Sequence, residues 1–296
     1  MKISYEDDSG FSANLFWDRV SFESSSPVSF NAVVAGLYLD HRKNPMQPTM
    51  IDGIIGLAYR TVSNANTLTP LDYLIQSHHS ELDNVFALCL DSKTGGSMTI
   101  GSPTNDPFYK SLQDVQWSPL LKETYYPVNM TALYVGTQRI DVAPDVFVRG
   151  DAIVDSGSTD ITLPRTAYDA LRTSIFALCN QGTDLIGICH DEQGHKIPSG
   201  QGLFAGLCYT LSEKEIAQFP TLYVRLGKDV SLPIEPSMYI RGGASYCDDK
   251  SQVGLAIDSG AVGDGTLLGD IFMQGFMTIF DRENKRIGFA PAVDHC

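Results

Sequence analysis

The sequence lacks a long apolar run, a leader-like start and low-complexity tracts, and each absence excludes a class of protein. No stretch of about 18 apolar residues occurs in the 296-residue chain, so the sequence predicts no membrane span. The opening residues, Met1-Lys2-Ile3-Ser4-Tyr5, contain no apolar segment of the kind that a signal peptide needs. What remains is a globular protein, whose hydrophobic content of 43% is enough for one large core or two ordinary ones.

Basic side chains are also scarce. The chain has 21 Lys and Arg against 35 Asp and Glu, which gives a formal net charge of −14. A surface of this sign disfavours nucleic acid and anionic membranes as partners. It is compatible with an acidic compartment, where many carboxylates would be partly neutralised.

The sequence also lacks closely spaced cysteine pairs, because the six cysteines form no CxxC motif. Their wide spacing favours three disulfides over a zinc site, and disulfides indicate the secretory route. The sequon Asn129-Met130-Thr131 is compatible with that route. Since no export signal precedes these cysteines, we expect the start of the chain to be missing. The cysteines are Cys89, Cys179, Cys189, Cys208, Cys247 and Cys296.

Short aromatic and β-branched runs separated by turn residues predict a mostly β protein. The chain has 26 Gly, 13 Tyr and 14 Phe, which supply those turns and runs. A turn is expected at Gly95-Gly96. Strands are expected over residues 2–5, 14–22, 29–39, 85–90, 97–100, 128–135, 139–142, 222–226, 238–240, 253–257, 277–280 and 286–289.

Two helices are expected among these strands. One spans residues 70–75, with Thr69 as its cap and Pro70 at its first position. The other spans residues 164–179, where apolar residues recur at helical spacing.

The chain has a two-lobed pattern. Residues 116–127 hold two prolines and few branched residues, which predicts a boundary between lobes at 1–117 and 118–296. Ile54-Ile55-Gly56 and Leu267-Leu268-Gly269 form one apolar-apolar-Gly unit in each lobe. The lobes are therefore expected to be related, with the first lacking its opening.

The segment 152–159, Ala-Ile-Val-Asp-Ser-Gly-Ser-Thr, is the main candidate for chemistry. Its apolar residues predict a buried strand that ends at Asp155 and so delivers a carboxylate to a fixed place. Gly157 permits a sharp turn and close approach to a ligand, and short hydroxyls follow. Taken alone, Asp-Ser-Gly is also ordinary turn chemistry.

Two further Asp-Ser-Gly tripeptides occur. The one at Asp8 lacks a preceding apolar strand, and a loop carboxylate lacks the rigid positioning that catalysis needs. The one at Asp258 follows an apolar strand and is expected to be a solvent-exposed turn. The six histidines lie in polar or loop contexts with no triad or metal spacing, so they are expected to be solvated.

These motifs together resemble the pepsin-like aspartic protease family. Residues 152–164 resemble the active-site strand and loop of its C-terminal lobe, and Gly53 to Tyr59 its N-lobe signature. Residues 268–272 and 280–290 match its closing strands, and residues 3–20 resemble the flap hairpin over its cleft. The resemblance runs in order from Ile3 to Cys296. It implies an all-β, bilobal fold in which the opening strands of the N-terminal lobe are missing.

The cysteine layout is most similar to the memapsin (β-secretase) branch, although, unlike in memapsin, no membrane anchor is expected after the catalytic unit. The resemblance implies bridges Cys89–Cys296 and Cys208–Cys247, which leaves Cys179 to pair with Cys189. Sequence alone does not settle connectivity, since six cysteines allow 15 pairings.

The resemblance also implies a mechanism with neither metal nor cofactor. Two nearby aspartates share a proton, so that one activates a water and the other donates to the peptide carbonyl. Asp155 would be the C-lobe member of this dyad. Ser158 would hydrogen-bond its carboxylate, and Tyr5 would close the flap over a peptide or protein substrate. The other expected substrate-binding residues are Gly157, Thr159 and Tyr126, and for Tyr126 structural packing is an equal alternative.

The second aspartate is the difficulty, because the family places it upstream of the flap and this chain begins at the flap. We expect an N-terminally truncated aspartic endopeptidase of an extracellular or acidic, lysosome-like compartment. The alternative is an inactive homologue that acts as a binding or inhibitory protein. A dimer in which each chain lends Asp155 is disfavoured, since an N-lobe occupies the face that a partner would need, and we expect a monomer.

Overall fold

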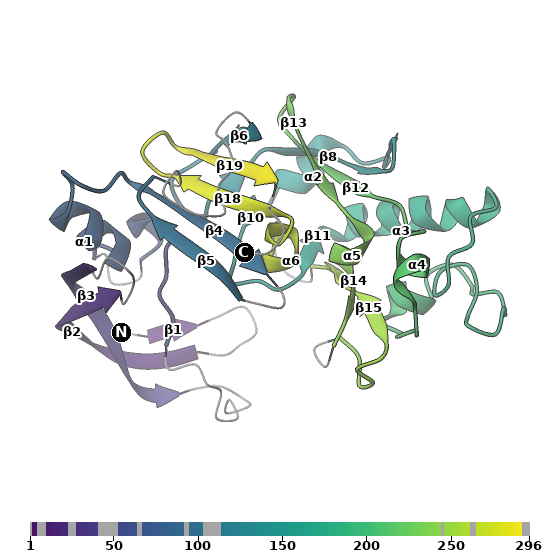
Figure 1. Ribbon diagram of the computed structural model, residues 1–296, viewed down its shortest axis with the longest axis horizontal. Coiled ribbons are helices and arrows are strands. Elements are labelled where there is room, and N and C mark those ends of the chain that lie inside the picture. Colours follow the sequence, from purple (N-terminus) through teal and green to yellow (C-terminus); the bar gives the residue numbers. More distant parts are fainter. Residues whose placement is uncertain are drawn as a thin grey trace. The chain divides into compact units, whose positions relative to one another are not determined.

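The computed structural model describes residues 2–4, 10–22, 28–40, 53–63, 67–91, 95–102, 114–243, 246–260 and 265–291 (Figure 1). Strands predominate in this part of the chain, and the predicted all-β class is confirmed. None of the helices in the described ranges is long and apolar enough to cross a membrane.

The chain divides into two compact units. Unit 1 comprises Met1–Asn84, Ile100–Ser102 and Lys122–Tyr125; unit 2 comprises Val85–Thr99, Pro103–Leu121 and Tyr126–Cys296. The predicted lobe boundary at 117/118 does not coincide with these units. Residues 85–99 belong to unit 2 because their first strand pairs with a strand near the end of the chain.

Unit 1 contains an antiparallel sheet in the order β1-β2-β3, formed by β1 (Lys2–Ser4), β2 (Gly10–Phe22) and β3 (Val28–Asp40). The one-turn helix η1 (Arg60–Val62) follows. Helix α1 (Pro70–Ser77) begins as predicted, because Thr69 accepts from Asp72 N while Asp72 accepts from Thr69 N. Leu71 and Leu74 form its buried face.

Unit 2 contains three larger sheets (Figure 1). One has the order β5-β4-β18-β19-β6, and every residue of its central strand β18 is buried. Phe86 stacks on Phe280 within it at 4.5 Å. Its strands are β4 (Val85–Asp91), β5 (Gly95–Ile100), β6 (Gln116–Pro119), β18 (Phe276–Asp281) and β19 (Arg286–Pro291).

The second sheet of unit 2 holds the candidate site and has the order β16-β11-β17-β10-β7. Its strands are β7 (Pro127–Val128), β10 (Ala152–Val154), β11 (Ile161–Leu163), β16 (Ile257–Ser259) and β17 (Thr266–Leu268).

The third sheet has the order β13-β12-β8-β9, with β8 (Met130–Val135), β9 (Gln138–Arg139), β12 (Leu222–Leu226) and β13 (Val230–Ile234). A separate pair is formed by β14 (Ile240–Gly242) and β15 (Val253–Leu255). The helices are α2 (Pro144–Val148), α3 (Arg165–Asn180), η4 (Gly202–Ala205), α4 (Glu213–Ile216), α5 (Pro236–Tyr239) and α6 (Asp270–Met273).

Several sequence predictions are corrected. Gly95 and Gly96 lie in β5, not in a turn, and their φ angles of 93° and 112° explain why glycine stands there. The strand predicted over 238–240 begins as helix α5, because Pro236 starts a helix readily. Strand β13 was missed because its proline disfavours a strand prediction. The run 253–257 divides between β15 and β16, which belong to different sheets.

Two disulfides lie in the described part of unit 2, and both join cysteines that the resemblance pairs. They link Cys179 to Cys189 and Cys208 to Cys247. Cys89 is disulfide-bonded as well, but Cys296 lies outside the described residues, so that third pairing stays a prediction.

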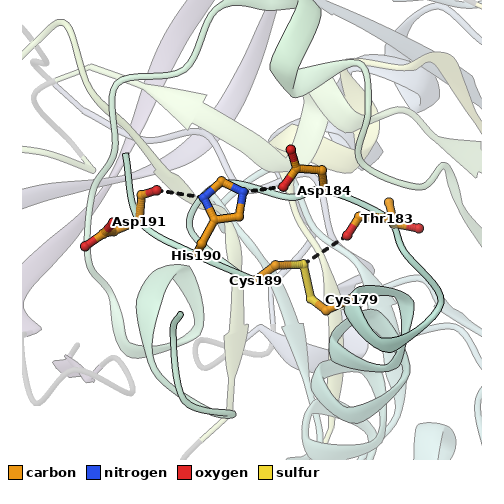
Figure 2. Close-up of a disulfide and its surroundings, with 6 residues drawn as sticks. All are labelled: Cys179, Thr183, Asp184, Cys189, His190 and Asp191. Carbon is orange, nitrogen blue, oxygen red and sulfur yellow. Dashed lines mark hydrogen bonds and ion pairs between the residues drawn. A yellow bond between two sulfur atoms is a disulfide. The ribbon is translucent and has the colours of Figure 1, made fainter. Parts of the chain in front are cut away.

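His190, which was expected to be solvated, directly follows the Cys179–Cys189 bridge. His190 is half-buried, and its Nδ1 lies 2.7 Å from the Asp191 carbonyl oxygen while its Nε2 contacts the Asp184 carboxylate (Figure 2). Both partners can only accept, so the arrangement is fully satisfied only by a doubly protonated imidazolium. The expectation of a solvated side chain is therefore wrong for His190.

Candidate active site

The candidate catalytic carboxylate stands at the end of a central strand. β10 pairs in parallel with β17 and antiparallel with β7, and its residues Ala152 and Val154 are buried. The ladder continues one residue further, since Asp155 N donates to Leu268 O at 3.1 Å. The backbone of Asp155 is therefore held by the sheet while its side chain leaves it.

Both carboxylate oxygens of Asp155 accept hydrogen bonds. Gly157 N donates to Oδ1 at 2.9 Å, and the Ser158 hydroxyl donates to Oδ2 at 2.7 Å. A β-carbon at position 157 would lie 3.1 Å from Oδ1, so glycine is what allows the backbone to approach. These bonds orient the carboxylate.

The remainder of the loop is docked through its backbone onto the start of α6. Asp270 N donates to Ser158 O at 2.8 Å, and Ile271 N donates to Thr159 O at 3.1 Å. The Thr159 side chain itself is exposed. The Leu267-Leu268-Gly269 unit thus supports the loop that carries Asp155, a role that the repeat alone did not reveal.

Sequence reasoning missed a polar cluster behind this loop. The Tyr246 hydroxyl donates to Asp160 Oδ1 at 2.8 Å. Burial raises the pKa of Asp160, which the Tyr246 hydrogen bond opposes and the Asp258 charge reinforces. Burial likewise raises the pKa of Asp270, where the nearby Arg241 opposes the shift and Asp160 adds to it. An acid five residues beyond Asp155 was the only available sequence signal.

Tyr126 lies in the core of unit 2. It is 5% exposed, and its ring packs edge-on against Phe86 and Phe280 with centroids 5.9 and 4.8 Å away. Its φ of 62° is unusual for a tyrosine. This environment favours the packing alternative over contact with a substrate.

The Asp-Ser-Gly tripeptide at Asp258 is not brought beside Asp155. Asp258 and Ser259 lie in β16, so the expected turn is wrong for these two residues. β11 and β17 separate β16 from β10, which places the two strands about 14 Å apart. Asp8 lies outside the described residues, as does Tyr5, so the flap assignment stays a prediction.

Comparison with known proteins gives a consistent result. The family model described as "Eukaryotic aspartyl protease" matches residues 1–292. A beta-secretase from Strongylocentrotus purpuratus is 26% identical over 304 residues, which cover 95% of this chain. A cathepsin D from Clupea harengus is 30% identical over 250 residues, and Pepsin-2B from Gadus morhua is 27% identical over 243 residues; each alignment covers 81% of this chain.

The relatives are considerably longer than this chain. The alignments span 54% of the beta-secretase, 54% of the cathepsin D and 64% of the pepsin. The chain therefore covers about half to two-thirds of the relatives it matches.

Proposed function

This chain belongs to the eukaryotic aspartyl protease family, and we propose that it acts as an aspartic-type endopeptidase in which Asp155 is one of two catalytic carboxylates. The observation that carries the proposal is the double hydrogen bonding of Asp155 at the end of β10. A carboxylate held in this way has one orientation, which acid-base catalysis requires.

The proposed reaction is hydrolysis of a peptide bond by water. Two like charges a few ångströms apart do not both ionise readily, so the pair shares one proton. The ionised carboxylate removes a proton from the water as it attacks the peptide carbonyl, and the protonated one donates to the carbonyl oxygen. The tetrahedral intermediate then collapses, and the amine leaves with a proton from the pair.

The partner carboxylate decides between this proposal and its alternative. An Asp-(Thr/Ser)-Gly on chain upstream of Met1 would complete the pair. Its absence would favour a binding or inhibitory protein that keeps the fold without the chemistry.

We also propose that the protein works as a monomer in the secretory pathway, in an extracellular or acidic, lysosome-like compartment, on peptide or protein substrates. Two disulfides support the oxidising route, and the net charge of −14 suits acid conditions.

The decisive experiment is hydrolysis of a quenched fluorescent peptide library at pH 4 by protein made from the full-length transcript. Asp155→Asn should lower kcat by about 10²–10⁴-fold or more, without changing the thermal midpoint appreciably. The matched control is Asp258→Asn, which alters the same tripeptide on β16 and should leave an active enzyme. An active Asp155→Asn variant would remove the site assignment, and an inactive wild type would favour the binding protein.

A further inference from the structure

We propose that Tyr246 and Asp160 form a positioning pair that holds the loop carrying Asp155 in its working geometry. The inference rests on the proposed function, since it concerns the same carboxylate. Neither residue touches the reacting atoms in this proposal. Both act through the Asp155–Asp160 loop.

The loop is held from two sides. Its inner side is fixed through the backbone bonds from Asp270 and Ile271 to the Ser158 and Thr159 carbonyls. Its far end is held by a side chain, because the Asp160 carboxylate accepts the Tyr246 hydroxyl hydrogen at 2.8 Å. If this bond is lost, the far end of the loop loses its side-chain support, while the inner side, the Asp155 N bond to Leu268 O and the hydrogen bonds within the loop remain.

Tyr246 is itself well anchored. The amides of Tyr246 and Cys247 both donate to Gly243 O at 3.0 Å. Cys247 is buried and cross-linked to Cys208. The hydrogen bond therefore connects the loop to a covalently tied part of unit 2, so it can transmit rigidity and not merely follow the loop.

The electrostatic surroundings make this bond sensitive to protonation. The charged groups that face the pair are the carboxylates of Asp258 and Asp270 and the guanidinium of Arg241. Burial raises the pKa of Asp160, and burial together with the Asp160 carboxylate raises the pKa of Tyr246, so the tyrosine stays a donor. Tyr246 stabilises the charged form of Asp160 against the two other carboxylates.

The test compares two tyrosines that each lose one hydroxyl. Tyr246→Phe should reduce kcat about tenfold with little change in KM, because the loop that carries Asp155 loses the hydrogen bond that holds its far end. The matched control is Tyr168→Phe. That hydroxyl donates to Phe204 O at 3.2 Å within unit 2, and its removal should leave kcat and KM unchanged.

A second pair of variants separates positioning from charge. Asp160→Asn removes the charge but keeps an oxygen that can accept from Tyr246, so it should retain most activity, and adding Tyr246→Phe to it should lower kcat as it does in the wild type. Asp160→Ala should lower kcat to the same extent as Tyr246→Phe. The double variant that combines Asp160→Ala with Tyr246→Phe should have a kcat no lower than that of either single variant. Additive losses, or equal losses for Tyr246→Phe and Tyr168→Phe, would overturn the proposal.

Failure of the proposed function would remain distinguishable. If the wild type hydrolyses no peptide, hydrogen exchange of the Gly157 amide reports loop order without activity, since that amide donates to Asp155. Tyr246→Phe should accelerate this exchange, whereas Tyr168→Phe should not. Unchanged exchange in Tyr246→Phe would refute the positioning pair whatever the activity.

Discussion

Gly269 and Ser158 approach each other so closely that position 269 has no room for a side chain. A β-carbon built there would lie 2.6 Å from the Ser158 carbonyl oxygen. The φ of Gly269 is −76°, a conformation open to any residue, so the requirement for glycine is steric. This glycine lets the loop that carries Asp155 rest directly on the start of α6.

Gly269→Ala should therefore destabilise the protein by about 1–3 kcal/mol, the usual range for an overpacked site. The methyl group would push the Ser158 carbonyl away and weaken the bond that this oxygen accepts from Asp270. Chemical denaturation measures the free energy of unfolding. The control is Gly56→Ala, because no described atom lies within 4 Å of a β-carbon at that position. Equal stability of the two variants would contradict the steric argument.

His190 should make stability depend on pH. The backbone hydrogen bond to Asp191 raises the pKa of His190, burial opposes the shift, and the Asp184 carboxylate adds to it. A raised pKa means that the native state binds the proton more tightly than the unfolded chain does. The stabilisation is thus fully present below the unfolded value of about 6.5 and is lost as pH rises through the native pKa.

We expect His190→Asn to abolish that part of the stability difference between pH 5 and pH 8, measured by chemical denaturation at both values. Asp184→Asn should reduce it, because one acceptor loses its charge. The exposed Asp141 provides a control, since Asp141→Asn should leave the difference as in the wild type. A pH response that survives His190→Asn intact would assign it to other groups.

The two disulfides should differ in their contribution to stability. Cys179–Cys189 closes a loop with a sequence separation of 10, and Cys208–Cys247 one of 39. On chain-entropy grounds, removing the first costs about 3 kcal/mol and removing the second about 4 kcal/mol. Paired Cys→Ala variants measured by denaturation test this order. A larger loss for the shorter loop would show that native contacts, and not loop length, set the difference.

Local sequence signals predicted the elements whose causes are local. Thr69 and Pro70 form a helix start by bonds within four residues, and the strand before Asp155 is a continuous apolar run. The predicted strand over 222–226 matches β12 for the same reason, since alternate residues are buried. The prediction failed where a proline is compatible with more than one kind of element. Pro236 starts helix α5 close to a predicted strand, and the proline in β13 caused that strand to be missed.

By itself, the sequence determined the β-rich class, the family and the position of Asp155, because hydrophobic pattern and short motifs act between neighbours in the chain. Only the tertiary structure decided what supports Asp155. Ser158 meets Gly269, and Asp160 meets Tyr246, across separations of 111 and 86 residues. Such pairs are set by strand order and packing, and neither leaves a local pattern. The same reason explains why β4, early in the chain, pairs with β18 near its end.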